Sequence, residues 1–118
     1  MDDFTRAYIE CALWSEKDDA GEPFDKNYTI ADIAPEDLAQ MQEDCAAFSG
    51  NNPLPSYRDQ NYTDAELAGH DFWLTRNHHG VGFWDRGLGE QGDTLTDAAH
   101  QFGECNLYVG DDGRIYIA

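Results

Sequence analysis

Basic residues are scarce in this chain of 118 residues. Lys and Arg together number 7, whereas Asp and Glu number 24, so the formal net charge at neutral pH is −17. A surface this negative repels nucleic acids and anionic membranes, and it attracts basic proteins. The composition therefore argues against direct binding to nucleic acid or to a membrane, and it favours a basic protein as the partner.

Paired cysteines and long hydrophobic runs are also lacking. The three cysteines, Cys11, Cys45 and Cys105, form no C-x-x-C pair. No stretch approaches the ~18 apolar residues of a membrane-spanning helix, and no apolar segment typical of a signal peptide is present near the first residue. Because Cys11 and Cys45 fall on apolar stripes of predicted helices, we expect buried, reduced thiols in a cytosolic protein.

Motifs that carry catalysis are missing as well. The sequence has no P-loop, no nucleophile elbow and no H-E-x-x-H metal motif, and it contains only three serines, at positions 15, 49 and 56. We therefore predict no catalytic residues, no cofactor and no metal ion. A binding protein is favoured over an enzyme.

Several stretches have the pattern of helices. Apolar residues recur every three or four positions over residues 3–15, 35–50 and 94–103. A capping-box pattern at Thr63–Glu66 predicts a further short helix, which Gly69 would end.

Two later segments have the pattern of β-hairpins. Residues 70–87 would turn at His78–His79, and residues 105–118 would turn at Gly110–Gly113. The predicted fold class is therefore α+β, with three to four helices packed on a small antiparallel sheet built from two hairpins. No repeat or shift in composition divides the chain, so we expect a single domain over residues 1–118.

The first of these hairpins, HDFWLTRNHHGVGFWDRG, is rich in aromatic and charged residues. Its predicted register pairs Trp73 with Trp84, and Asp71 with Arg86, across the two strands. Trp and Arg dominate the energetics of protein interfaces. The candidates for short-range contact with a partner are Trp73, Arg76, Trp84 and Arg86.

An alternative interpretation makes the same hairpin a reactive site. His70, Asp71, His79 and Asp85 supply imidazole and carboxylate groups of the kind that acid–base catalysis or a metal ion requires. This alternative is a small metal-dependent or nucleic-acid-processing enzyme. Neighbouring residues of a strand point to opposite faces, so His78 and His79 would not share one ion.

Acidic residues are densest between Glu16 and Asp44, where ten acids and two lysines occur in 29 residues. Glu36 and Glu43 lie seven residues apart on one line of a helix, about 10.5 Å, close to three base-pair steps of duplex DNA at ~3.4 Å each. This spacing fits mimicry of DNA, whereas a merely solubilising surface would give the same counts. The candidate partner-binding acids are Asp18, Asp19, Glu22, Asp25, Glu36, Asp37, Glu43 and Asp44.

Three segments, HDFWLTRN (70–77), GFWDRGLG (82–89) and LYVGDDG (107–113), resemble those of a family of small acidic proteins encoded by bacteriophages, prophages and plasmids. The resemblance covers nearly the whole chain apart from residues 51–61. The family has no established activity, so the resemblance implies no catalytic residues. Its members have R-N-G-H-G where this chain has R-N-H-H-G, so His78 stands where a turn with positive φ would favour glycine.

The resemblance implies a phage or mobile-element setting and the cytosol of a bacterial host. By analogy with other small acidic proteins of such elements, we expect an inhibitor that occupies the basic groove of a host nucleic-acid-binding defence protein as a DNA mimic. A phage structural or accessory protein with a solubilising acidic surface is the other alternative. The exposed edge of the C-terminal hairpin would also permit a homo-oligomer.

Overall fold

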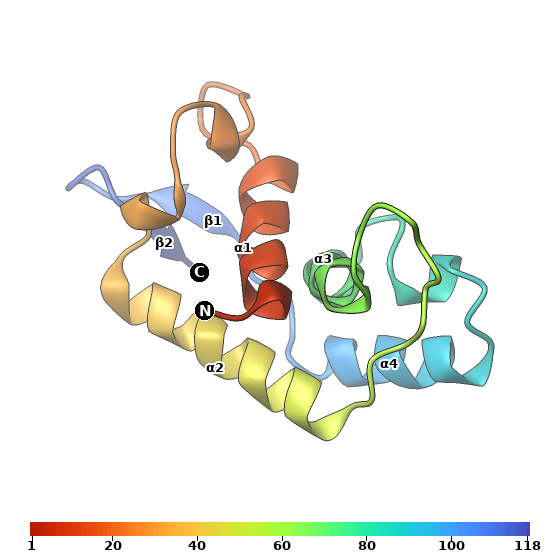
Figure 1. Cartoon of the computed structure of the whole chain (residues 1–118). Helices are drawn as coiled ribbons and strands as arrows, with labels where there is room; N and C mark the ends of the chain where they lie inside the picture. Colours follow the sequence, from red (N-terminus) through yellow and green to blue (C-terminus); the bar gives the residue numbers. More distant parts are fainter.

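Four α-helices precede a single β-hairpin along the chain (Figure 1). The computed structural model describes all residues, 1–118. Its main elements are α1 (Asp3–Ser15), α2 (Pro35–Asn51), α3 (Asp64–Arg76), α4 (Glu90–His100), β1 (Leu107–Val109) and β2 (Ile115–Ile117). Three short 3-10 helices are η1 (Phe24–Lys26), η2 (Ile30–Asp32) and η3 (Phe83–Asp85). The fold is α+β and mostly helical.

Helices α1 and α2 form where the sequence predicted them. Asp2 caps α1, because its carboxylate accepts a hydrogen bond of 2.8 Å from the backbone N–H of Thr5. Pro35 occupies the first turn of α2, where its missing N–H has no intrahelical acceptor to lose. The buried face of α2 consists of Met41, Cys45 and Phe48.

The predicted hairpin of residues 70–87 is wrong, because its first half is helical. α3 begins at the predicted capping box of Thr63 and Glu66, but it continues through Gly69 to Arg76. Gly69 lies where α3 packs against α1, and a Cβ at this position would overlap the backbone carbonyl of Phe4. The glycine therefore allows two helix backbones to touch and does not end the helix.

The second half of that segment is a loop that folds back along α3. Phe83, within η3, is fully buried, and its backbone N–H donates to the Thr75 hydroxyl at 3.1 Å. Trp73 is also fully buried, whereas Trp84 is exposed. The predicted cross-strand pairing of Trp73 with Trp84 is therefore absent, since Trp73 is helical and no strand forms here.

The C-terminal hairpin is confirmed. β1 and β2 pair antiparallel with Tyr108 opposite Tyr116, and the chain turns between Gly110 and Gly113, whose N–H donates to the Gly110 carbonyl. This is the only sheet, so the predicted sheet of two hairpins is wrong. α4 is also confirmed, although it begins at Glu90, before the predicted start.

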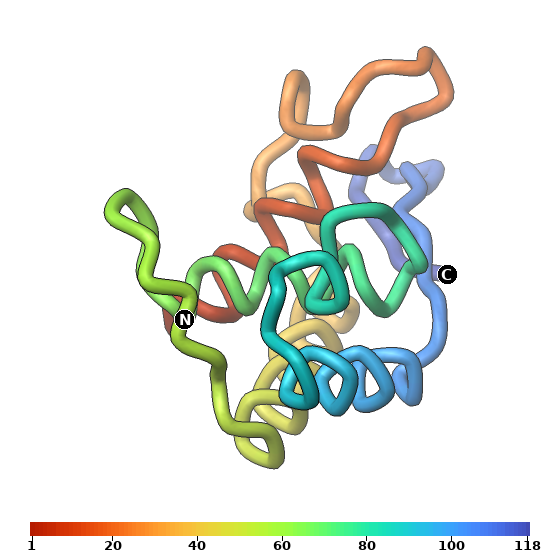
Figure 2. Tube along the Cα trace, turned by 90° about the vertical axis from the view of Figure 1, so that its right-hand side faces the viewer, coloured from red at the N-terminus to blue at the C-terminus, as the bar shows by residue number.

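The core lies between the helices and the hairpin as one cluster of 21 buried residues. Aromatic rings dominate it, and Phe48 of α2 stacks on Phe72 of α3 with ring centroids 4.2 Å apart. α1 packs against both α2 and α3, and α3 packs on α4. The connection between α2 and α3 projects from the rest of the molecule (Figure 2). None of the helices combines the length and hydropathy needed to cross a bilayer.

Candidate functional site

Two of the four aromatic and basic residues predicted to contact a partner are buried. Trp73 has no exposed surface, and its indole N–H donates to the Ser15 hydroxyl at 3.0 Å. Arg76 is only 5% exposed, and Arg86 is partly covered. Trp84 alone is more than half exposed. In the folded protein Trp73 and Arg76 are therefore out of a partner's reach, contrary to the expectation from the sequence.

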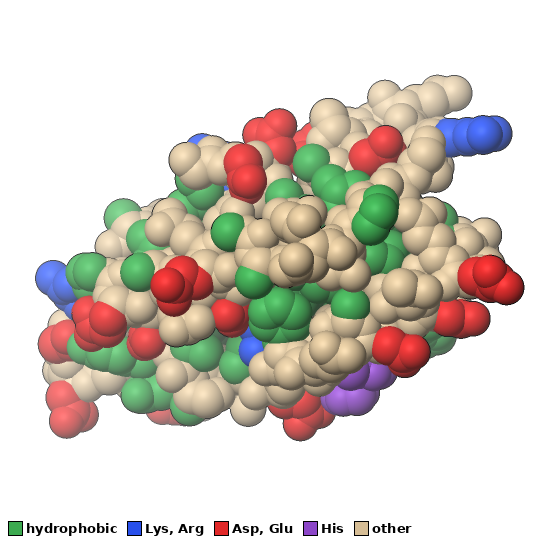
Figure 3. Space-filling model, turned by 90° about the horizontal axis from the view of Figure 1, so that it is seen from below, with side chains coloured by type: hydrophobic (Ala, Val, Ile, Leu, Met, Phe, Trp, Pro, Cys, Tyr) green, Lys and Arg blue, Asp and Glu red, His purple; other side chains and the backbone are tan.

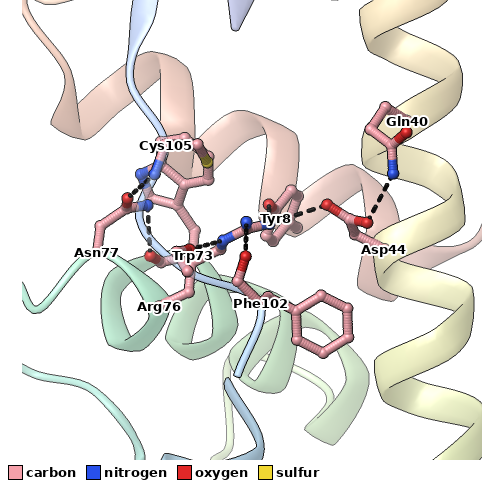
Figure 4. Close-up of polar contacts among 9 residues, drawn as sticks. Tyr8, Gln40, Asp44, Trp73, Arg76, Asn77, Phe102 and Cys105 are labelled. Atoms are coloured by element: carbon pink, nitrogen blue, oxygen red, sulfur yellow. Dashed lines mark hydrogen bonds and ion pairs between the residues drawn. The ribbon is translucent and has the colours of Figure 1, made fainter. Parts of the chain in front are cut away.

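Arg76 joins four segments of the chain through a single guanidinium (Figure 4). Its Nη1 donates to the Tyr8 hydroxyl of α1 at 2.9 Å and to the Asp44 carboxylate of α2 at 3.0 Å. Its Nε and Nη2 donate to the carbonyls of Gly103 and Phe102, just past the end of α4. Cations are favourable beside the carbonyls that end a helix. Arg76 thus holds the fold together.

A second polar cluster surrounds Asp71, which is fully buried. Arg86 donates two hydrogen bonds to its carboxylate, from Nε at 3.0 Å and from Nη2 at 2.8 Å. The Tyr57 hydroxyl donates to the same carboxylate at 2.9 Å, and the Nδ1 atom of His70 lies 3.3 Å from it. Asp71 and Arg86 meet as predicted, but as a bidentate ion pair that anchors the loop after α3.

The tyrosines and arginines of both clusters hold their protons more tightly than free side chains do, because their pKa values are raised. Burial raises the pKa of Tyr8 well above its usual value. Burial and the nearby Asp71 carboxylate do the same to the pKa of Tyr57, and hydrogen bonding to Asp71 raises the pKa of Arg86. No buried side-chain nitrogen or oxygen lacks a hydrogen-bond partner. Both clusters are therefore satisfied networks of the kind that rigidify a core.

The residues of the enzymatic interpretation do not gather in one place. His70 contacts Asp71, but that carboxylate is already held by Arg86. His79 instead lies 3.4 Å from a carboxylate oxygen of Glu16, and Asp85 is exposed in η3. No three His, Cys, Asp or Glu side chains are placed to hold a metal ion together.

The eight acids predicted to bind a partner divide into two groups. Four stabilise local structure: Asp18 accepts backbone hydrogen bonds in the turn before η1, Glu22 pairs with Lys26, Asp37 accepts from the backbone of β2, and Asp44 pairs with Arg76. The side chains of the other four make no hydrogen bond or ion pair, and these four are the exposed residues Asp19, Asp25, Glu36 and Glu43. Only the second group is free to meet a partner without loss of a fold contact.

Most of the negative charge of the molecule has no basic neighbour. Of the 24 acids, only Glu22, Asp44 and Asp71 lie within 4.0 Å of a Lys or Arg. On the face shown in Figure 3, acidic side chains are distributed among hydrophobic and uncharged ones, and basic side chains are few. The charge on this face is therefore dispersed and does not form one continuous sheet.

A pocket of about 330 Å³ between α1 and α3 was missed by the sequence analysis. It is lined by Trp14 of α1 and by Tyr62, which precedes α3, and each of these side chains is 58% exposed. No other large hydrophobic side chain is as exposed. Glu10 and Glu66 also line it, and no Lys or Arg does. We refer to it as the Trp14 pocket.

One signal in the sequence pointed to this pocket. The stripe of Phe4, Tyr8, Cys11 and Ala12 faces the core, whereas Trp14 falls roughly a quarter turn away from it at ~100° per residue. A tryptophan that a helix does not bury is free to serve a contact at the surface.

The chain matches no protein family, and no curated protein or solved structure is significantly similar to it.

Proposed function

We propose that this protein is a non-enzymatic binding protein whose negative surface engages the basic, nucleic-acid-binding groove of a partner protein. The observation that carries the proposal is the charge left after pairing, since only three of the acids have a Lys or Arg neighbour. Unpaired surface charge attracts an oppositely charged partner over long range and speeds association. The satisfied buried networks support a binding role over a catalytic one.

Competition with nucleic acid is supported by the size and charge of the molecule. It is 43 Å long, a length over which duplex DNA carries about 25 phosphate charges, and its net charge is −17. It therefore has roughly two-thirds of the charge per unit length of a duplex. That density suffices for electrostatic attraction by the same basic groove, and this is the sense in which we propose DNA mimicry.

The proposal also includes the cell in which the protein acts. The resemblance of HDFWLTRN, GFWDRGLG and LYVGDDG to small acidic proteins of phages, prophages and plasmids supports a partner in the cytosol of a bacterial host. A host protein that binds nucleic acid in defence against such elements has the basic groove that this surface would occupy.

Affinity capture at two salt concentrations tests the proposal. Immobilised protein is exposed to host extract in 50 mM and in 500 mM salt, and captured proteins are identified and challenged with duplex DNA. We expect a basic nucleic-acid-binding protein to be retained at low salt and released by high salt or DNA, because surface charges are screened within about 10 Å at ~0.1 M salt. If the captured protein were retained equally well in high salt and in the presence of duplex DNA, the proposal would be overturned.

A pair of variants with matched charge separates a local surface from the overall field. One carries Asp19→Asn, Asp25→Asn, Glu36→Gln and Glu43→Gln, and the other carries Asp85→Asn, Asp93→Asn, Asp97→Asn and Asp111→Asn. All eight positions are exposed, and each variant loses four negative charges. We expect the first variant to release the partner at lower salt than the second. If both variants released the partner at the same salt concentration, these four acids would not be part of the binding surface.

A further inference from the structure

We propose that the Trp14 pocket receives one basic side chain of the partner, arginine in preference to lysine. This inference rests on the proposed function, since the partner is the basic protein proposed above, and it identifies where the first close contact forms. The pocket lies between α1 and α3, and none of the four free acids Asp19, Asp25, Glu36 and Glu43 lines it.

Helix geometry builds the two walls of the pocket. Ala7, Glu10, Cys11 and Trp14 repeat at three- and four-residue intervals along α1, so they lie along one side of the helix, with Cys11 at the edge of its core-facing stripe. Glu66, Leu67 and His70 form the facing line on α3. The close packing of α1 and α3 at Gly69 holds these lines together. The pocket is thus formed by two helices, and Tyr62 also lines it.

Its aromatic walls are suited to a cation. Trp14 and Tyr62 each leave more than half of their surface exposed, and the electron-rich faces of Trp and Tyr attract Arg and Lys. The His70 ring lies 5.9 Å from the Trp14 ring, which restricts the tryptophan on one side. A guanidinium stacks on such rings better than a compact, strongly hydrated ammonium does.

The charges in the pocket have the matching sign. Glu10 is exposed and makes no hydrogen bond, so its carboxylate is free to pair with a ligand. Glu66 is held in place, because one of its carboxylate oxygens accepts the N–H of Thr63 in the capping box at 3.0 Å. Arg and Lys carry a charged head on an apolar stem, so the apolar floor and the two carboxylates complement both parts of the side chain.

Titration with a side-chain probe tests the inference directly. The probe is N-acetyl-arginine methylamide, compared with the lysine analogue and with the uncharged citrulline analogue, while amide and indole N–H signals are followed by two-dimensional NMR. We expect saturable changes in the chemical shifts of the Trp14 indole N–H and of the Glu10 and Leu67 amide N–H groups. The Kd should be on the order of 1 mM for so small a ligand. Binding of the lysine analogue is expected to be weaker, and citrulline should cause no saturable shift.

Variants then assign the contacts. Trp14→Ala should weaken binding of the arginine probe about threefold or more, Trp14→Phe should weaken it less, and Glu10→Gln should weaken it measurably. The control is Glu43→Gln, which removes the same charge from the exposed face of α2 and should leave the pocket shifts unchanged. Circular dichroism verifies that each variant is folded.

Three outcomes would overturn the pocket assignment. The first is equal affinity for the arginine and citrulline probes. The second is chemical-shift changes confined to Trp84 or to the acids of α2. The third is affinity for the arginine probe equal to that of the wild type in both Trp14→Ala and Glu10→Gln. The proposed function fails on a different result, namely capture of the partner that is unchanged by high salt and by duplex DNA. A partner that is captured in a salt-dependent way by Trp14→Ala as well as by the wild type would contradict the pocket and leave the acidic binding role standing.

Discussion

A buried arginine is costly to fold around, because removing a guanidinium from water loses its hydration. Arg76 regains this loss through hydrogen bonds to Tyr8, Asp44 and two backbone carbonyls, so each of its three guanidinium nitrogens has an acceptor. The residue looked like a surface contact in the sequence because nothing local marks its partners. Tyr8 is 68 positions away along the chain.

Replacing this side chain tests its role in the fold. We predict that Arg76→Met destabilises the protein by about 3–5 kcal/mol, because it leaves Tyr8, Asp44 and two carbonyls without their donor. The control is Arg6→Met, which makes the same change in net charge at an exposed position of α1 that lacks an ion pair. Urea denaturation, monitored by circular dichroism, measures the free energy of unfolding of both variants. Similar midpoints for the two variants would contradict the structural role of Arg76.

At the scale of secondary structure, prediction succeeded where one face of an element meets solvent. α1, α2 and the C-terminal hairpin have an exposed and a buried side, so their hydrophobic periodicity is visible in the sequence. α3 is different, because Asp71 and every residue from there to Arg76 is buried. A helix enclosed on all sides has no amphipathic pattern to detect, and its aromatic run was therefore interpreted as a strand.

Two helical glycines, Gly69 and Gly50, allow a matched test of how α1 and α3 pack. Gly69→Ala places a methyl group on the Phe4 carbonyl, whereas an added Cβ at Gly50 of α2 would meet nothing within 4 Å. We predict that Gly69→Ala costs about 1–3 kcal/mol or more, as overpacked sites do, and that Gly50→Ala raises stability by about 0.5–1 kcal/mol. Thermal denaturation of both variants measures the difference. A neutral Gly69→Ala would show that the helices separate at little cost.

The end of α3 makes a third prediction. His78 has a φ of 57°, and the N–H groups of His78 and His79 donate to the carbonyls of Thr75 and Leu74 in the pattern of a Schellman motif. Glycine is the usual residue at the first of these positions, so we predict that His78→Gly stabilises the protein by up to about 1 kcal/mol. This gain is reduced by the loss of the ring that stacks on His100 at 4.2 Å.

His78→Ala is the control for this change. It removes the same imidazole but keeps a Cβ in the left-handed region, so it should be less stable than His78→Gly. Denaturation in urea compares the two variants with the wild type. If alanine and glycine gave equal stability, the backbone conformation at position 78 would carry no strain.

At the scale of the whole molecule, its cysteines and two of its tyrosines are kept neutral by burial, while its surface is strongly charged. Burial raises the pKa of Cys11 to about 12 and also raises the pKa values of Cys45 and Cys105. The pKa values of the buried Tyr8 and the half-buried Tyr57 are raised as well. The interior therefore holds protons that the unfolded chain releases at lower pH.

This difference predicts a loss of stability in alkali. An unfolded cysteine ionises near pH ~8.5, so above that pH the folded state binds more protons than the unfolded state, and stability falls as the pH rises from about 9 toward 12. Urea denaturation at pH 7.5, 9 and 10 measures the fall. In the Cys11→Ala variant the fall should be shallower, because one of the raised pKa values is gone. A flat profile across these pH values would contradict the prediction.

The position of Arg76 has a consequence for how the protein opens. The Arg76 side chain of α3 is hydrogen-bonded to α1, to α2 and to the segment that follows α4. Neither α1 nor α2 can therefore separate from α3 without breaking a hydrogen bond to Arg76. Amide hydrogens at the centres of α1, α2 and α3 should therefore exchange with solvent through a single shared event, with nearly equal protection. A protein this small would then be recognised and degraded by proteases as a whole and not segment by segment.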